Sequence, residues 1–126
     1  QIRTLLGRLC RFHLWEPNSF GMHKAMLHED ALREHGPGIR RAYTYKALNK
    51  LIQGSAADMT KKAMLELYKE GIIAHIQIHD ELDLSVESDA QAKKIIEIME
   101  NAVSLEVPNK VDYETGKTWG DIYDKD

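Results

Sequence analysis

The sequence predicts an α+β fold in which antiparallel strands form a hairpin sheet and helices cover one of its faces. Three observations predict it: a helical repeat of apolar residues over 43–70, two β-forming runs at 72–78 and 82–86, and a second amphipathic helix after residue 88. Helices and antiparallel strands in this order are typical of α+β domains. With 126 residues and 43% hydrophobic composition, the chain is expected to be a single domain over 1–126 with a modest core.

Composition and charge exclude several classes of protein. No apolar run reaches the ~18 residues that a membrane-spanning helix needs, and the first ten residues hold no secretory signal. The single Cys10 excludes an internal disulfide framework and fits a reducing, cytoplasmic compartment. The net charge of −3 is uneven, with basic residues concentrated in 1–50 and acids toward the C-terminus. This charge neither demands nor forbids a polyanionic partner. Because the chain opens inside an apparent strand, we expect it to be part of a longer protein.

The sequence of the first third of the chain predicts little regular secondary structure. Residues 2–15 mix β-forming and basic residues around Gly7, which suggests a twisted hairpin with a basic face. Residues 16–41 are rich in proline and glycine and are expected to be a loop-rich insertion, interrupted by a short helix at about 23–34.

The long helix over 43–70 is predicted by apolar residues at three- and four-residue steps. Gly54 interrupts it, and Ser55 with Asp58 resembles a capping box, so we expect a kink or break there. Gly71 is expected to end the helix. The residues expected to form one buried stripe are Leu48, Ile52, Ala56, Met59, Ala63 and Leu67.

The two β runs that follow predict a hairpin whose tip carries acids. If the even-numbered residues all face the core, Ile78 pairs with Leu82, and His79, Asp80 and Glu81 form the connection. Beyond the hairpin, Ser88 and Gln91 predict the cap of the second helix, which extends to about residue 103. A short strand at about 110–113 and a final segment at 119–123 complete the chain.

Two adjacent carboxylates at a hairpin tip allow three interpretations. Asp80 and Glu81 are common solvated turn residues. A general acid and base pair fits less well, because adjacent residues on an extended chain point apart. The third interpretation is a site for a hard metal ion, to which a carboxylate elsewhere would contribute. The alternation of residues alone does not decide between them.

Asn49 and Gln53 lie four residues apart on the predicted helix, to one side of the apolar stripe. Asn and Gln can donate to purine N3 and pyrimidine O2, the acceptors that every base pair presents in the minor groove. An ordinary exposed polar helix face explains the same two residues.

Together these segments resemble a known family. "ALNKLIQGSAADMTKKAM", followed by "IQIHDELDLSV", closely resembles the C-terminal part of the palm of family A DNA polymerases, the bacterial polymerase I and phage replicative class. "TLLGR" at residues 4–8 is similar to the family's "TLxGR" segment, and the main match runs over 47–119. The tract 16–41 is longer than in the bacterial enzymes, and the segments "RFHLWEP" and "RRAYTYKALN" at its two ends resemble those of phage members. The resemblance implies an incomplete palm, in which a hairpin sheet packs against two long helices, and a cytoplasmic location in a bacterium or phage-infected cell.

The resemblance implies two catalytic residues, Asp80 and Glu81, and one DNA contact, His79, at the hairpin tip. Asp80 corresponds to the aspartate that coordinates the two Mg²⁺ ions of nucleotidyl transfer. Glu81 would support the metal site or the primer terminus, and His79 would touch the primer strand near its 3′ end.

The resemblance also implies DNA contacts elsewhere. Asn49 and Gln53 would contact the minor groove near the newly formed pair, and Arg8 would face the nucleic-acid backbone. Primer-template DNA and deoxynucleotides are the implied substrates.

The chain departs from the family in that the second metal-binding aspartate, in the motif "DYSQIELR", and the fingers helix are absent from the 126 residues. We therefore expect no polymerase activity and no tight Mg²⁺ binding from this chain alone. Its expected partner is the upstream polymerase portion, with the fingers, the rest of the palm and the thumb. The alternative is a non-catalytic split subunit or remnant that binds duplex DNA or a partner protein. An incomplete sheet would also leave an exposed edge, through which copies would self-associate.

Overall fold

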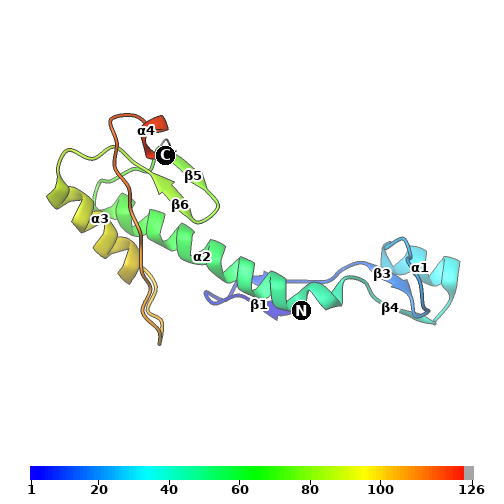
Figure 1. Ribbon diagram of the computed structural model, residues 1–126. Coiled ribbons are helices and arrows are strands. Elements are labelled where there is room, and N and C mark those ends of the chain that lie inside the picture. The colour runs from blue at the N-terminus through cyan, green and yellow to red at the C-terminus, as the bar shows by residue number, and fades with distance from the viewer. Residues whose placement is uncertain (124–126) are drawn as a thin grey trace. The chain divides into compact units, whose positions relative to one another are not determined.

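The computed structural model describes residues 1–123 and combines helices with short antiparallel strands, so the predicted α+β class is confirmed (Figure 1). The chain divides into two compact units, Gln1–Asp58 and Met59–Asp126, with the boundary inside helix α2. None of the helices in the described part of the chain is long and apolar enough to cross a lipid bilayer. In chain order the elements are β1 (Ile2–Arg3), β2 (Leu9–Cys10), β3 (Trp15–Pro17), α1 (His28–His35), β4 (Ile39–Arg41), the 3₁₀ helix η1 (Thr44–Lys46), α2 (Ala47–Lys69), β5 (Ile76–Ile78), β6 (Glu81–Asp83), α3 (Asp89–Asn101) and α4 (Gly120–Tyr123).

The strands pair only in twos within residues 1–123, as β1–β2, β3–β4 and β5–β6, all antiparallel. The prediction of a single sheet with helices on one face was therefore wrong for this chain. Each strand has only two or three residues, so each pair has few backbone hydrogen bonds with which to extend a sheet.

The β1–β2 hairpin is shorter than predicted. Its turn is closed by hydrogen bonds from Thr4 N to Arg8 O and from Gly7 N to Thr4 O, both 2.9 Å, and Gly7 has a φ of +86° that favours glycine. The hairpin ends at Cys10, because Trp15 pairs with Arg41 in the next sheet.

The segment 16–41 contains more regular structure than a loop. Strands β3 and β4 bring its two ends together, and an ion pair of 2.9 Å between Arg40 Nε and Glu16 Oε1 links the strands across the sheet. Helix α1 contacts both strands and buries Ala31 completely. The predicted helix at 23–34 begins later, at His28, because Met26 instead forms a β-bridge with Trp15.

Helix α2 runs unbroken through Gly54, so the predicted break was wrong. Ser55 and Asp58 do not cap a helix; their side chains accept hydrogen bonds from Leu5 N at 3.0 Å and from Arg8 Nε at 2.8 Å. A Cβ atom on Gly54 would lie 2.9 Å from Cγ2 of the buried Thr4. The glycine therefore allows the β1–β2 turn to approach the helix closely.

The apolar stripe of α2 is buried only in its second half. Ala63 and Leu67 are buried, whereas Leu48 and Ile52 are 68% and 57% exposed. Periodicity predicts which residues share a face, but a face is buried only where another element covers it.

The end of α2 follows the prediction. Gly71 has a φ of +76°, and Ile72 N and Gly71 N donate to Leu67 O and Tyr68 O, both at 2.9 Å. These two hydrogen bonds form a Schellman motif, in which glycine takes the left-handed position without steric cost.

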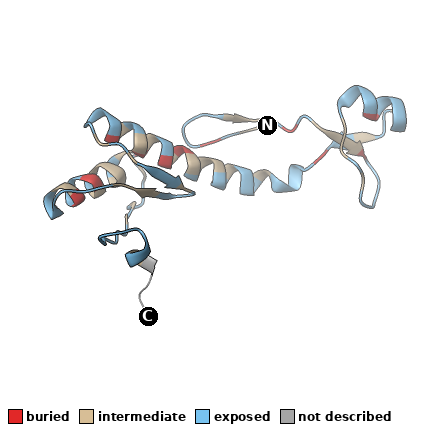
Figure 2. Cartoon of the chain, turned by 90° about the horizontal axis from the view of Figure 1, so that it is seen from above, coloured by how far each residue is buried: buried red, intermediate tan, exposed pale blue. Residues whose placement is uncertain are grey.

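The core of the second unit is formed by α3 and the second half of α2, which lie side by side in both views (Figures 1 and 2). The predicted cap of α3 is confirmed, because Ser88 Oγ accepts from Gln91 N at 3.2 Å. Lys94 of α3 pairs with Glu70 at 3.0 Å. The buried apolar side chains of this unit are Ala63, Leu67, Ala92, Ile95 and Val103.

Residues 110–113 do not form the predicted strand. The backbone N–H of Val111 donates to Glu100 Oε1 at 2.9 Å. This N–H therefore bonds to a side chain and not to the backbone of a neighbouring strand, as it would in a sheet. The predicted final segment is the short helix α4.

Candidate functional site

The β5–β6 hairpin has a two-residue connection, His79 and Asp80, because Ile78 pairs directly with Glu81. The predicted pairing of Ile78 with Leu82 was wrong by one residue, so Glu81 is the first residue of β6. The shift moves Leu82 to the opposite face from Ile76 and Ile78. The prediction assumed that all even positions are buried, but Ile76 is 42% exposed and does not impose that register.

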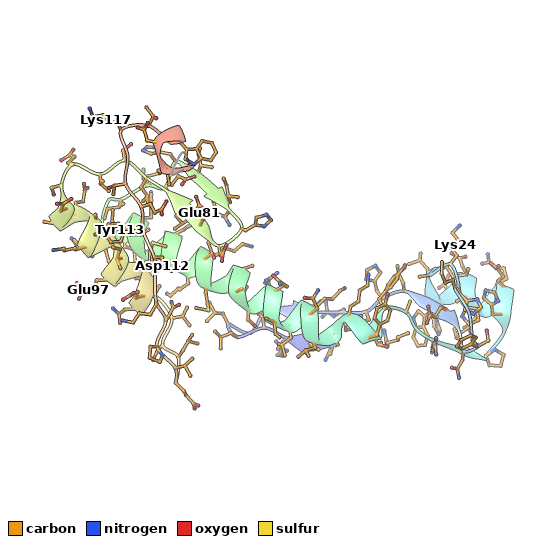
Figure 3. All side chains as sticks on the ribbon, in the orientation of Figure 1. Lys24, Glu81, Glu97, Asp112, Tyr113 and Lys117 are labelled. Atoms are coloured by element: carbon orange, nitrogen blue, oxygen red, sulfur yellow. The ribbon has the colours of Figure 1, made fainter. Side chains whose placement is uncertain are left out.

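The turn holds its acid outward. His79 adopts a φ of 50°, in the left-handed region that residues other than glycine rarely occupy. Its carbonyl oxygen accepts a hydrogen bond of 3.2 Å from Gln77 Nε2, which stabilises the turn. The Asp80 side chain is exposed at this tip, and Glu81 follows it on β6 (Figure 3). The two predicted catalytic residues, Asp80 and Glu81, and the predicted DNA contact His79 are therefore consecutive at the tip, and the Asp80 carboxylate is exposed.

The ligands for a metal ion are incomplete in the described residues. Within 1–123, no group of three or more His, Cys, Asp and Glu side chains is placed to hold a metal ion. Mg²⁺ is typically bound through one or two carboxylates, together with phosphate oxygens and water. Asp80 supplies a single accessible carboxylate, which meets only the first part of that requirement.

Asn49 and Gln53 lie one turn apart near the start of α2, and both are exposed. Their spacing places both amides on the same side of the helix, as predicted. They belong to the first unit, whereas His79, Asp80 and Glu81 belong to the second.

Arg8 is held by Gly54 and Asp58 of the QGSAAD segment, residues 53–58 of α2. Its Nε donates to Asp58 Oδ1 and its Nη2 to the carbonyl of Gly54, both at 2.8 Å. The Arg8 side chain is still 51% exposed, whereas that of Asp58 is only 6% exposed. The guanidinium is thus fixed on one side by α2 and open to solvent on the other.

Asp58 was not predicted to have this role. The Thr4 hydroxyl, followed by the Arg8 guanidinium, holds the pKa of the Asp58 carboxyl below its ordinary value, against the opposing effect of burial. These contacts join TLLGR and QGSAAD, two of the three segments on which the resemblance rests. The available signal was a lone acid on the buried side of an amphipathic helix, which requires a cationic partner.

Comparison with known proteins identifies the family of this chain. The family described as "DNA polymerase family A" matches residues 2–121. The chain is 37% identical over 119 residues to a DNA-directed DNA polymerase of Pseudomonas phage M6, covering 94% of this chain and 15% of that protein. It is 46% identical over 84 residues to DNA polymerase I of Bacillus caldotenax, covering 60% of this chain and 10% of that protein. No solved structure matches the chain.

The chain therefore spans only a small part of the curated relatives that it matches. The phage relative covers more of this chain than the Bacillus relative does. A match over nearly all of its 126 residues shows that the chain belongs to DNA polymerase family A.

Proposed function

We propose that this chain is the C-terminal part of the palm of a template-directed DNA polymerase, and that it contributes a metal-binding carboxylate and minor-groove contacts to nucleotidyl transfer. The observation that carries the proposal is the exposed Asp80 on a two-residue hairpin turn, in a chain whose relatives are named DNA polymerases. The family assignment explains why this carboxylate is held out to solvent rather than paired internally.

At the hairpin tip, Asp80 would hold magnesium beside the primer terminus. When bound, two Mg²⁺ ions would stabilise the negative charge that develops on the entering and leaving oxygens of phosphoryl transfer. Glu81, at the next position, would support this site or the primer end. His79 would contact the primer strand, and its left-handed backbone conformation fixes the direction of the turn.

At the start of α2, Asn49 and Gln53 would donate hydrogen bonds to purine N3 and pyrimidine O2 in the minor groove. These acceptors are common to all base pairs, so the contacts would test pair geometry without reading sequence. Arg8 would contact a phosphate with its outward Nη1 donors, because Asp58 and Gly54 already engage Nε and Nη2. This anchoring orients the guanidinium before DNA arrives.

The remaining parts of the reaction would come from the upstream polymerase portion. A second carboxylate, the fingers and the thumb would complete the site for deoxynucleotides and primer-template DNA. We propose that the chain alone neither extends a primer nor binds Mg²⁺ tightly, because one carboxylate is a weak site for a strongly hydrated ion.

Primer extension tests this proposal. The isolated chain with Mg²⁺ and four deoxynucleotides should be inactive, and mixing it with the upstream polypeptide should restore extension. Asp80→Ala should abolish the restored activity with little change in circular dichroism. Asp112→Ala, a matched loss of an exposed carboxylate, should leave activity unchanged.

Two results would contradict the proposal. Extension by the isolated chain would refute its dependence on a second part, and full activity of restored Asp80→Ala would refute the metal assignment. A non-catalytic remnant, the alternative function, would show neither restoration nor sensitivity to Asp80.

A further inference from the structure

The first unit is strongly basic although the chain as a whole is acidic. Residues 1–58 contain nine Lys and Arg and five Asp and Glu, a formal charge of +4, whereas the whole chain carries −3. A local excess of this kind attracts polyanions regardless of the overall charge. The positions of the basic side chains that form no ion pair then indicate where on this unit a polyanion would bind.

Two of these cations lie over aromatic rings beside the start of α2. The guanidinium carbon of Arg41 lies 4.7 Å from the ring centroid of Trp15, and Nζ of Lys50 lies 4.9 Å from that of Phe12. Arg41 Nη1 also donates to the carbonyl oxygen of Phe12. The buried Phe12 therefore connects both cations in one contiguous cluster.

A third cation continues the cluster along the 3₁₀ helix. Nζ of Lys46 lies 5.2 Å from the ring centroid of Tyr43 and 5.7 Å from that of Tyr45. Lys46 and Lys50 are one helical turn apart, so both project from the same side.

These three cations have no carboxylate partner among the described residues. Within residues 1–123, no ion pair involves Arg41, Lys46 or Lys50, whereas Arg8 and Arg40 are each paired with a carboxylate. An aromatic ring orients a cation without cancelling its charge. The aromatic rings thus hold three positively charged groups in place, where they can bind the phosphates of a nucleic-acid backbone.

The same face continues into the proposed minor-groove contacts. Lys46 and Lys50 are four residues apart, as are Asn49 and Gln53, and the two pairs are offset by three residues; all four side chains are exposed. Figure 2 shows that the first turns of α2 are largely exposed. A strand that continues from the amides toward the start of α2 would therefore pass over the lysines.

The exposed tyrosines favour single-stranded DNA over duplex DNA as the ligand of this surface. Tyr45 is 81% exposed and Tyr43 is 41% exposed. Tyr43 has a φ of 62°, so the backbone changes direction there, immediately before the 3₁₀ helix. Exposed aromatic rings beside cations are typical of single-strand binding, because unpaired bases have free faces on which to stack and paired bases do not.

We propose that the surface formed by Arg41, Tyr43, Tyr45, Lys46 and Lys50 binds single-stranded DNA that continues from the duplex contacted by Asn49 and Gln53. The inference rests on the proposed function, in which α2 faces primer-template DNA. The lysines and Arg41 bind phosphates, and the tyrosines stack on unpaired bases.

Fluorescence anisotropy of the full chain with labelled oligothymidylate tests the surface. Tyr45→Ala should weaken binding at least about fivefold, from the usual effect of losing one stacking platform. Lys46→Gln with Lys50→Gln should reduce the slope of log affinity against log salt by about 1.4, since each phosphate contact contributes about 0.7. The double Arg variant at the same two positions should keep the wild-type slope.

The matched control removes the same charge from the second unit, with Lys93→Gln and Lys94→Gln, and should leave the affinity unchanged. Circular dichroism should show the same helix content in every variant. Wild-type affinity in Tyr45→Ala, an unchanged salt slope in the double Gln variant, or tighter binding of a blunt duplex than of oligothymidylate would each overturn the inference.

Failure here is separable from failure of the proposed function. Asp80→Ala should bind oligothymidylate as the wild type does, because the hairpin tip is not part of this surface. If the surface variants bind normally while Asp80→Ala abolishes restored extension, only the single-strand inference fails. If single-strand binding depends on the surface but no extension is restored, only the polymerase proposal fails.

Discussion

The contact between Arg8 and Asp58 predicts an asymmetric effect of removing either partner. The Asp58 side chain is only 6% exposed, so Arg8→Ala leaves a buried carboxylate without the positive charge that offsets the cost of its burial. Arg8 is 51% exposed, so after Asp58→Ala water can solvate the guanidinium. A buried group left without its partner carries the larger penalty. Arg8→Ala should therefore destabilise the chain more than Asp58→Ala does.

The magnitude follows from the hydrogen bonds that are lost. Arg8→Ala removes two charge-assisted hydrogen bonds of 2.8 Å, one of them to a carboxylate. We expect a loss of about 2–3 kcal/mol for Arg8→Ala and about 1–2 kcal/mol for Asp58→Ala, after discounting for the solvent that screens Arg8. The double variant should lose about as much as Asp58→Ala, because no carboxylate then remains buried.

Urea denaturation followed by circular dichroism measures these differences, and their pH dependence adds a second test. The pKa of Asp58 is lowered in the folded state from its ordinary value of 3.8. Its ionisation therefore stabilises the fold fully above that value, and the stabilisation is lost as pH falls through the folded pKa. The difference in unfolding free energy between the Arg8→Ala and Asp58→Ala variants should therefore be present at neutral pH and become smaller at acid pH. An Asp58→Ala loss equal to or larger than that of Arg8→Ala at neutral pH would refute the reasoning.

Two further predictions concern local geometry and the sheet edges. Gly71→Ala should cost about 1 kcal/mol in urea denaturation, because alanine is strained at a φ of +76°, whereas Gly38→Ala, without a positive φ and with open space around its Cβ, should be neutral or slightly stabilising. Equal effects of the two substitutions would contradict this. Self-association through exposed strand edges should make gel-filtration elution depend on concentration, and Ile76→Lys on β5 should reduce that dependence. A concentration-independent monomer peak would count against edge pairing.

Local signals in the sequence predicted several features that the structure confirms. The end of α2 at Gly71, the Ser88 cap and the end-to-end order of long helix, hairpin and second helix all depend on residues within a few positions of one another. The family followed from two short segments whose residue types are specific in combination. The exposure of Asp80 at the tip was predicted, but its catalytic role and those of the other site residues remain proposals.

The tertiary structure alone decided the rest, because the decisive partners lie far apart in the chain. Gly54 suggested a break in α2, and only the approach of Thr4 shows that the glycine makes room for a turn. Asp58 resembled a capping residue until Arg8, 50 positions earlier, proved to be its partner. The uniform stripe of α2 is buried where α3 covers it and exposed where no described element does. Amino-acid periodicity determines which side chains share a face, and only the packing of distant segments determines which faces are buried.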